Sequence, residues 1–173
     1  DLLAELSVPR EAAGLVLLLH TQEGGRLTHK STYLMESLNR SSIGVISVDL
    51  LTPEESLQDC ETDELKHDLR LLGLRIAKIA DWLNGRSEFG GLSLGYMGSD
   101  TGAAAAAYAA AEYPESVQAL TQSVKDGAQG FGELKFHVAA DGPELTRVYD
   151  LAAELNVPVL VHFQEVDHFE NEG

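Results

Sequence analysis

A glycine-flanked aspartate is the residue of this sequence best placed to do chemistry. The apolar run Leu92–Met97 leads directly into Gly98-Ser99-Asp100-Thr101-Gly102, and an alanine-rich helix is expected over Thr101–Glu112. The pattern Gly-x-nucleophile-x-Gly between a strand and a helix is typical of a strained turn, whose central side chain points out at the carboxyl edge of a sheet. A carboxylate at a helix N-terminus is also favoured for structural reasons alone, by the helix dipole and the free N–H groups.

The segments around this turn predict the sheet that must position it. Apolar runs alternate with segments of helical period, which is typical of a parallel sheet covered by helices on both faces. The expected strands are Leu3–Val8, Leu15–His20, Gly44–Asp49, Leu92–Met97, Val117–Leu120, Gly130–Val138 and Val157–Phe163. The expected helices are Lys30–Asn39, Glu64–Leu83, Thr101–Glu112 and Pro143–Leu155, with a solvated loop and helix start over Pro53–Glu64. We predict one α/β domain over residues 1–173, a truncated three-layer sandwich with a mainly parallel central sheet.

Composition excludes several classes of partner. The chain has 173 residues, enough for one core, and a formal net charge of -16, so nucleic acid and anionic membranes would be repelled. Its single cysteine, Cys60, cannot form an internal disulfide, and its longest apolar run, Gly14–Leu19, is too short to cross a bilayer. We expect an acidic cytoplasmic protein that acts on a small molecule, with no nucleic-acid or membrane partner.

The motifs of the first two-thirds resemble one enzyme family. The stretches Gly14–His20, Val48–Glu55, Asp81–Leu83 and Gly95–Ala106 are similar, in order and spacing, to small dienelactone-hydrolase-like members of the α/β-hydrolase family. The resemblance covers about residues 1–118. It implies a nucleophile at the elbow, an oxyanion hole, and an acid and a histidine supplied by later loops.

Carried over residue by residue, the resemblance assigns a candidate site. Asp100 stands where relatives carry Ser or Cys, as in the epoxide-hydrolase and haloalkane-dehalogenase branches, which form an ester on an aspartate. The backbone N–H groups of Thr21 and Thr101 would form the oxyanion hole, although His20-Thr21-Gln22-Glu23 replaces the usual His-Gly. Asp167 would be the triad acid, with His168 beside it.

The histidine departs from the family pattern. It normally follows one more strand and helix, and since the sequence ends at Gly173 we expect His168 or another local histidine to replace it. Adjacent residues of an extended loop point apart, so Asp167 and His168 would make a poor charge relay. His29 and His67 lie among polar residues and receive no role.

The last third resembles a different family. Residues of about 122–173, through Gly130–His137, Pro143–Leu155 and Val157–Glu165, are similar to a β-α-β unit of metal-dependent amidohydrolases. That resemblance implies Glu133 or Lys135, together with His162, as metal ligands. A catalytic site needs about three protein ligands, so we expect no metal and no other cofactor. The two resemblances together predict a chimera joined near residues 114–124. It could be a natural recombinant, a gene remnant or an engineered fusion. We expect the second part to add two strands to the sheet.

Four functions follow from these patterns. The first is hydrolysis of small esters, lactones, epoxides or halides with Asp100 as the nucleophile. The second is a non-catalytic α/β scaffold, and the third is a remnant of a metal-dependent amidohydrolase. A nucleotide-binding, flavodoxin-like protein ranks last because Asp100 would repel a phosphate. An uncovered sheet edge also predicts a homodimer.

Overall fold

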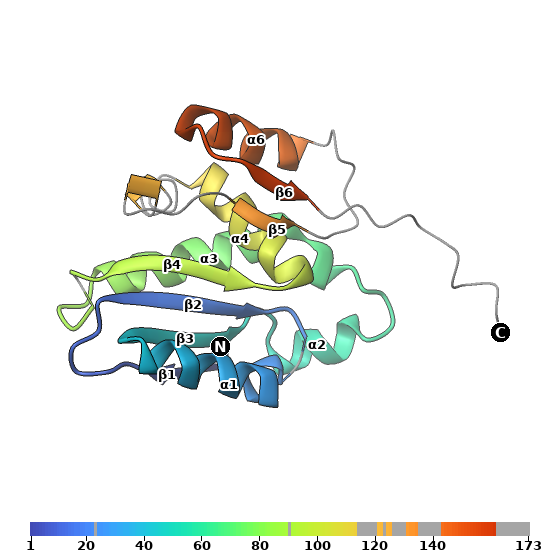
Figure 1. The fold of residues 1–173 in the computed structure, drawn as a ribbon. Helices are drawn as coiled ribbons and strands as arrows, with labels where there is room; N and C mark the ends of the chain where they lie inside the picture. Colours follow the sequence, from blue (N-terminus) through green and yellow to red (C-terminus); the bar gives the residue numbers. More distant parts are fainter. Residues whose placement is uncertain are drawn as a thin grey trace.

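A four-stranded, mainly parallel sheet forms the centre of the fold (Figure 1). This computed structural model describes residues 1–22, 24–89, 91–113, 121–122, 124–125, 131–134 and 143–161. The sheet has the order β1-β3-β2-β4, formed by β1 (Ala4–Ser7), β2 (Gly14–His20), β3 (Ile43–Asp49) and β4 (Ser93–Gly98). Strand β2 runs parallel to both β3 and β4, whereas β1 pairs antiparallel with β3. The predicted mixed α/β class with a central sheet is confirmed.

Helices cover both faces of this sheet. Successive residues of a strand point to opposite faces, so Leu17 and Leu19 of β2 join one apolar cluster and Leu18 joins another. The first cluster packs under α3 (Leu69–Asn84) and α4 (Asp100–Glu112), and the second packs under α1 (His29–Arg40). Because each of these leucines is at most 3% exposed, the central strand is buried on both sides, as its continuous apolar run predicts.

The alanine-rich helix lies close to its neighbour. Ala105 and Ala109 of α4 are fully buried, and a Cβ atom added to Gly73 of α3 would lie 2.7 Å from the ring of Tyr108. Small side chains on both helices allow this approach. The tight packing expected from the alanine run is therefore present.

The segment after β3 differs from its prediction. Helix α2 (Pro53–Asp59) forms where a loop and helix start were expected, and Thr52 and Glu55 close a capping box at its N-terminus. The single helix expected over Glu64–Leu83 is wrong. A 3-10 turn, η2 (Leu65–His67), comes first, and α3 begins only at Leu69, because the side chain of Asp68 accepts the N–H of Leu71 and caps a new helix.

The expected extension of the sheet by two strands is not seen in the described residues. Strands β5 (Phe131–Leu134) and β6 (Val159–Val161) pair parallel with each other in a separate two-stranded sheet. Helix α4 packs against β5 and against α6 (Pro143–Leu155), as Figure 1 shows. The strands are short and their register is irregular. The strand predicted at Val117–Leu120 lies outside the described residues.

No helix in the described part of the chain has the length and apolar character needed to cross a membrane.

Candidate active site

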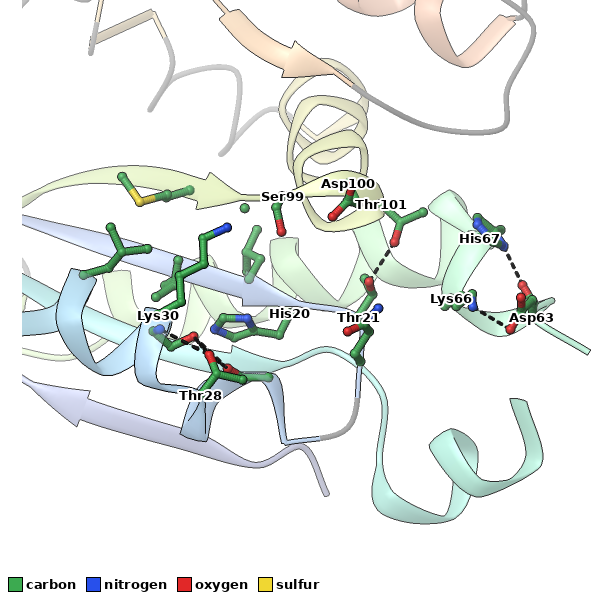
Figure 2. A pocket seen from close by; sticks show the side chains of 18 residues that line it. His20, Thr21, Thr28, Lys30, Asp63, Lys66, His67, Ser99, Asp100 and Thr101 are labelled. Carbon is green, nitrogen blue, oxygen red and sulfur yellow. Dashed lines mark hydrogen bonds and ion pairs between the residues drawn. The ribbon is translucent and has the colours of Figure 1, made fainter. Parts of the chain in front are cut away.

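A pocket of about 660 Å³ opens at the carboxyl ends of β2 and β4. Parallel strands bring the loops that follow them to one edge of the sheet, so residues distant in sequence meet there. Figure 2 labels most of the polar side chains that line this pocket, namely His20, Thr21, Thr28, Lys30, Asp63, Lys66, His67, Ser99, Asp100 and Thr101; Gln22 and Ser31 line it as well.

The turn from β4 into α4 has the strained geometry that its sequence predicts. Asp100 has a positive φ of 51°, which is uncommon for a residue with a side chain, and its carboxylate is exposed in the pocket. A Cβ atom on Gly98 would lie 2.8 Å from the nitrogen of Ala103, and one on Gly102 would lie 2.7 Å from the carbonyl oxygen of Leu19. Neither position has room for a side chain. The two glycines thus allow the turn that lifts Asp100 above the sheet.

A buried hydrogen bond ties this elbow to the loop after β2. The hydroxyl oxygens of Thr21 and Thr101 lie 2.7 Å apart, and the two residues are 9% and 7% exposed. Thr101 is the second residue of α4, and an N–H group at that position has no acceptor within the helix. The hydrogen bond therefore holds the ends of β2 and β4 together beside the N-terminus of α4, a place where an anion can bind.

His20 lies on the other side of the same loop in a buried network. Its Nε2 atom is 2.9 Å from the hydroxyl of Ser47, which is fully buried on β3. Burial lowers the pKa of His20, Asp49 opposes this change, and the nearby ammonium of Lys30 adds to it. Its surroundings therefore favour the neutral form of the imidazole.

An ion pair holds the next turn against this network. Arg26 lies in the 3-10 turn η1 (Gly25–Leu27), and its Nε atom is 3.2 Å from Oδ2 of Asp49. The backbone N–H of Arg26 also donates to Oδ1 of Asp49 at 3.1 Å. A Cβ atom on Gly25 would lie 2.7 Å from the Cβ of His20, so only glycine permits this close contact.

A third polar segment approaches the pocket from between α2 and α3. Its anchor is the carboxylate of Asp59, which is 4% exposed and accepts the N–H groups of Leu65 at 2.6 Å and Lys66 at 2.9 Å. Burial alone would raise the pKa of Asp59, but these backbone donors hold it below its usual value. Lys66 in turn pairs with Asp63 at 2.5 Å.

The structure brings some of the predicted residues together. Asp100, Thr101 and Thr21 line one pocket, whereas Asp167, His168 and the possible metal ligands His162 and Lys135 lie outside the described residues. Glu133 lies in β5. Among the described residues, no group of three or more His, Cys, Asp or Glu side chains is arranged to hold a metal ion.

Sequence reasoning missed the basic residues of the pocket. His20, Lys30, Lys66 and His67 all line it, and none was assigned a role in the site. A signal was available, because Lys66 and His67 follow strand β3 in the chain, and loops after parallel strands gather at the carboxyl edge. The expected continuous helix from Glu64 concealed it.

A parallel sheet with helices on both faces, and a strained strand-to-helix elbow at its carboxyl edge, is the architecture of the α/β-hydrolases. The structure has this fold in its dienelactone-hydrolase-like form. It is similar to the dienelactone hydrolase of Anabaena variabilis, with 29% identity, a TM-score of 0.64, and coverage of 99% of this chain and 84% of that chain.

Esterase Est1E of Butyrivibrio proteoclasticus shares the fold alone. Its structure is 18% identical with a TM-score of 0.55, covering 92% of this chain and 72% of that chain. Its complex with ferulic acid is 19% identical with a TM-score of 0.58, covering 92% and 73%. The structural likeness thus continues past residue 118, and no amidohydrolase is among these relatives.

Part of the sequence is also similar to two curated proteins of Mycobacterium tuberculosis. Proteins of two strains, provisionally named phosphoribosyl transferases, are 32% identical over 115 residues, which is 66% of this chain. The chain spans about a quarter of the length of these relatives, since the match covers 25% of each. No family model matches the sequence.

Proposed function

We propose that this chain is a hydrolase of small electrophilic molecules, with Asp100 as the nucleophile. The observation that carries the proposal is the exposed carboxylate at a positive φ between two glycines, inside a pocket at the carboxyl edge of the sheet. The likeness to a dienelactone hydrolase supports hydrolysis as the reaction class.

The nucleophile type favours epoxides over esters and lactones. A carboxylate that attacks a saturated carbon of an epoxide or alkyl halide forms an ordinary ester, which water can then hydrolyse. The same carboxylate attacking an ester carbonyl would form an anhydride, which is a much less stable product. Epoxides and halides are therefore the first substrates to test, and esters and lactones the second.

The remaining residues have roles in the second, hydrolytic step. Water adding to the Asp100 ester would create an oxyanion, which the backbone N–H groups of Thr21 and Thr101 are proposed to stabilise. The hydroxyl pair of these threonines supports the assignment, since it holds the two backbones near each other. Asp167 and His168 remain the proposed assisting groups from the C-terminal region.

Isotope labelling tests the proposal at the nucleophile. The purified chain is mixed with less than one equivalent of styrene oxide in ¹⁸O-labelled water, and peptide mass spectrometry then locates the label. We expect ¹⁸O in the Asp100 carboxylate after one turnover, and loss of at least about 100-fold in rate for Asp100→Ala. Hydrolysis that proceeds unchanged in Asp100→Ala would rule out the proposal.

A non-catalytic scaffold is the second candidate. Two observations favour it, namely the aspartate in place of the usual Ser or Cys and the altered loop at Thr21. Assay of Asp100→Ser with p-nitrophenyl acetate separates the candidates. Inactivity of both the parent chain and this variant supports the scaffold, whereas esterase activity in the variant shows that the pocket retains hydrolytic machinery.

The amidohydrolase interpretation rests on Glu133 or Lys135 together with His162. Elemental analysis of the purified protein tests it, and stoichiometric zinc or manganese would revive it. The names of the mycobacterial relatives add no transferase step to the proposal, because the match covers only 25% of those proteins.

A further inference from the structure

The loop between α2 and α3 brings an imidazole to the pocket that holds Asp100. We call residues 59–68 the α2–α3 segment; Lys66 and His67 lie near its end, and both line the pocket. We propose that His67 is the base that activates water for hydrolysis of the Asp100 ester. This inference rests on the proposed function and adds to it a residue from a segment where the family resemblance places no histidine.

The hydrogen bond of His67 fixes the form of its ring. Nδ1 lies 2.6 Å from the backbone carbonyl oxygen of Asp63. A carbonyl oxygen can only accept, so Nδ1 carries the hydrogen and donates it. The neutral ring is then the tautomer whose lone pair is on Nε2, which is the form that a water-activating base requires.

The α2–α3 segment is anchored on both sides of this histidine. Before it, the buried carboxylate of Asp59 accepts the N–H groups of Leu65 and Lys66. After it, the side chain of Asp68 accepts the N–H of Leu71 at 2.9 Å and begins α3. A catalytic side chain must be held by such supporting contacts to act reproducibly. His67 therefore lies in a turn that hydrogen bonds hold on both sides.

The other histidine of the pocket is less suited to this role. The Nε2 atom of His20 lies against the buried hydroxyl of Ser47, and the ring is packed against Gly25. In Figure 2, His67 lies on the Thr101 side of the pocket and His20 on the opposite side of Thr21. The geometry thus favours His67 for a reaction at Asp100.

The proposed reaction balances with an epoxide as substrate. An oxygen of Asp100 forms a bond to an epoxide carbon, the ring C–O bond breaks, and the alkoxide takes a proton from solvent. Water then adds to the carbonyl carbon of this ester while Nε2 of His67 takes a proton from it. The carbonyl carbon releases the alkyl oxygen, which takes the proton from His67. Asp100 returns one proton to solvent, so epoxide and water have become a diol.

Trapping the ester separates the role of His67 from that of Asp100. Each protein is mixed with excess styrene oxide, quenched in acid at successive times and weighed by intact-protein mass spectrometry. His67→Asn keeps an amide N–H near the position of Nδ1 but has no base at the position of Nε2. We expect its ester to accumulate and to hydrolyse at least about 100-fold more slowly than in the parent chain, with partial rescue by added imidazole.

Matched variants make every outcome decisive. His29→Asn, on α1 and outside the residues that line the pocket, should behave as the parent chain does. His67→Gln places its amide at the Nε2 position and should also accumulate ester, so the result does not depend on one variant folding. An ester that turns over in both His67 variants at the parent rate overturns the role of His67 and leaves the hydrolase proposal intact. Absence of any Asp100-dependent ester in every protein overturns both.

Discussion

The positive φ of Asp100 should cost the folded chain a measurable amount of free energy. At φ 51° a Cβ atom costs about 1–2 kcal/mol, whereas glycine has no such penalty but loses about 0.5–1 kcal/mol more entropy on folding. Both Asp100→Gly and Asp100→Ala lack the carboxylate, so a comparison of the two isolates the backbone effect. We expect Asp100→Gly to be about 0.5–1 kcal/mol more stable than Asp100→Ala. Urea unfolding of the two variants measures the difference. Equal stability, or a more stable alanine variant, would show that the turn is relaxed in solution.

A second glycine of the elbow is constrained by space. A Cβ atom at position 102 would lie 2.7 Å from the carbonyl oxygen of Leu19, which belongs to the central strand and cannot move freely. We expect Gly102→Ala to lower the free energy of unfolding by about 1–3 kcal/mol. Gly91→Ala is the matched control, because nothing lies within 4 Å of its added Cβ atom. A loss of the same size in both variants would contradict the steric explanation.

At the scale of elements, one ion pair joins α2 to α3. The guanidinium of Arg75 donates to both carboxylate oxygens of Glu55, at 2.6 and 2.8 Å, and to the carbonyl oxygen of Leu50 at 2.6 Å. Glu55 also accepts the N–H of Thr52 in the capping box. The side-chain hydrogen bond from Arg75 lowers the pKa of Glu55 to about 2, although burial opposes the shift. The two helices that flank the α2–α3 segment are thus linked directly.

The lowered pKa of Glu55 predicts how the free energy of unfolding depends on pH. The pKa of Glu55 is about 2 in the folded chain and 4.5 in its ordinary state, so its contribution is complete above pH 4.5 and is lost as the pH falls towards 2. We expect Glu55→Gln to lose about 1 kcal/mol at pH 6, since the pair is partly exposed, and to match the parent chain near pH 2. Urea unfolding across this range measures the effect. Glu54→Gln, an exposed change on the same helix, should give no such pH-dependent difference.

Some elements were predictable and others were not, for physical reasons. The run that became β2 is continuously apolar from Gly14 to Leu19, and the run that became β3 is apolar except for Ser47 and its last residue, Asp49. The pattern from Leu92 to Glu112 contains a strand, a glycine-flanked turn and an alanine-rich helix in order. The break at Asp68 was missed because Leu65 and Leu69 fit one helical stripe. Only the capping of α3 by Asp68 and the capture of two N–H groups by Asp59 make the interruption favourable.

The candidate site shows the same limit. Asp100, Thr101 and Thr21 could be found because the motif and the end of a strand identify them. His67 was harder to find: it follows β3 in the chain, but the turn that carries it forms only when the carboxylate of Asp59 accepts the N–H groups of Leu65 and Lys66. Short patterns reveal residues on the ends of strands, whereas residues delivered by irregular loops require the tertiary contacts that shape those loops.

At the scale of the whole molecule, the net charge of -16 lowers the stability of the folded state. Like charges are closer together in the compact chain than in the unfolded one, and salt screens their repulsion. We expect Tm to rise by about 2–4 °C between about 20 mM and about 200 mM NaCl. Differential scanning calorimetry measures this change, and a Tm that falls with salt would show that attractive pairs dominate instead.

The homodimer remains a prediction. In the described residues, β1 and β4 are the outer strands of the four-stranded sheet, and Leu6 on β1 is 54% exposed. An outer strand with exposed apolar side chains invites pairing with another copy. Sedimentation velocity at micromolar concentration tests the expectation, and a single monomeric species would refute it.

The hydroxyl pair of Thr21 and Thr101 has a consequence for anyone who wishes to redesign this enzyme-like pocket. Either hydroxyl can donate to the other, and replacing one alone leaves a buried polar atom without its partner. Mutant libraries that randomise these positions one at a time would therefore lose many members to poor folding. The two codons should be diversified jointly, so that a matched apolar pair can be recovered.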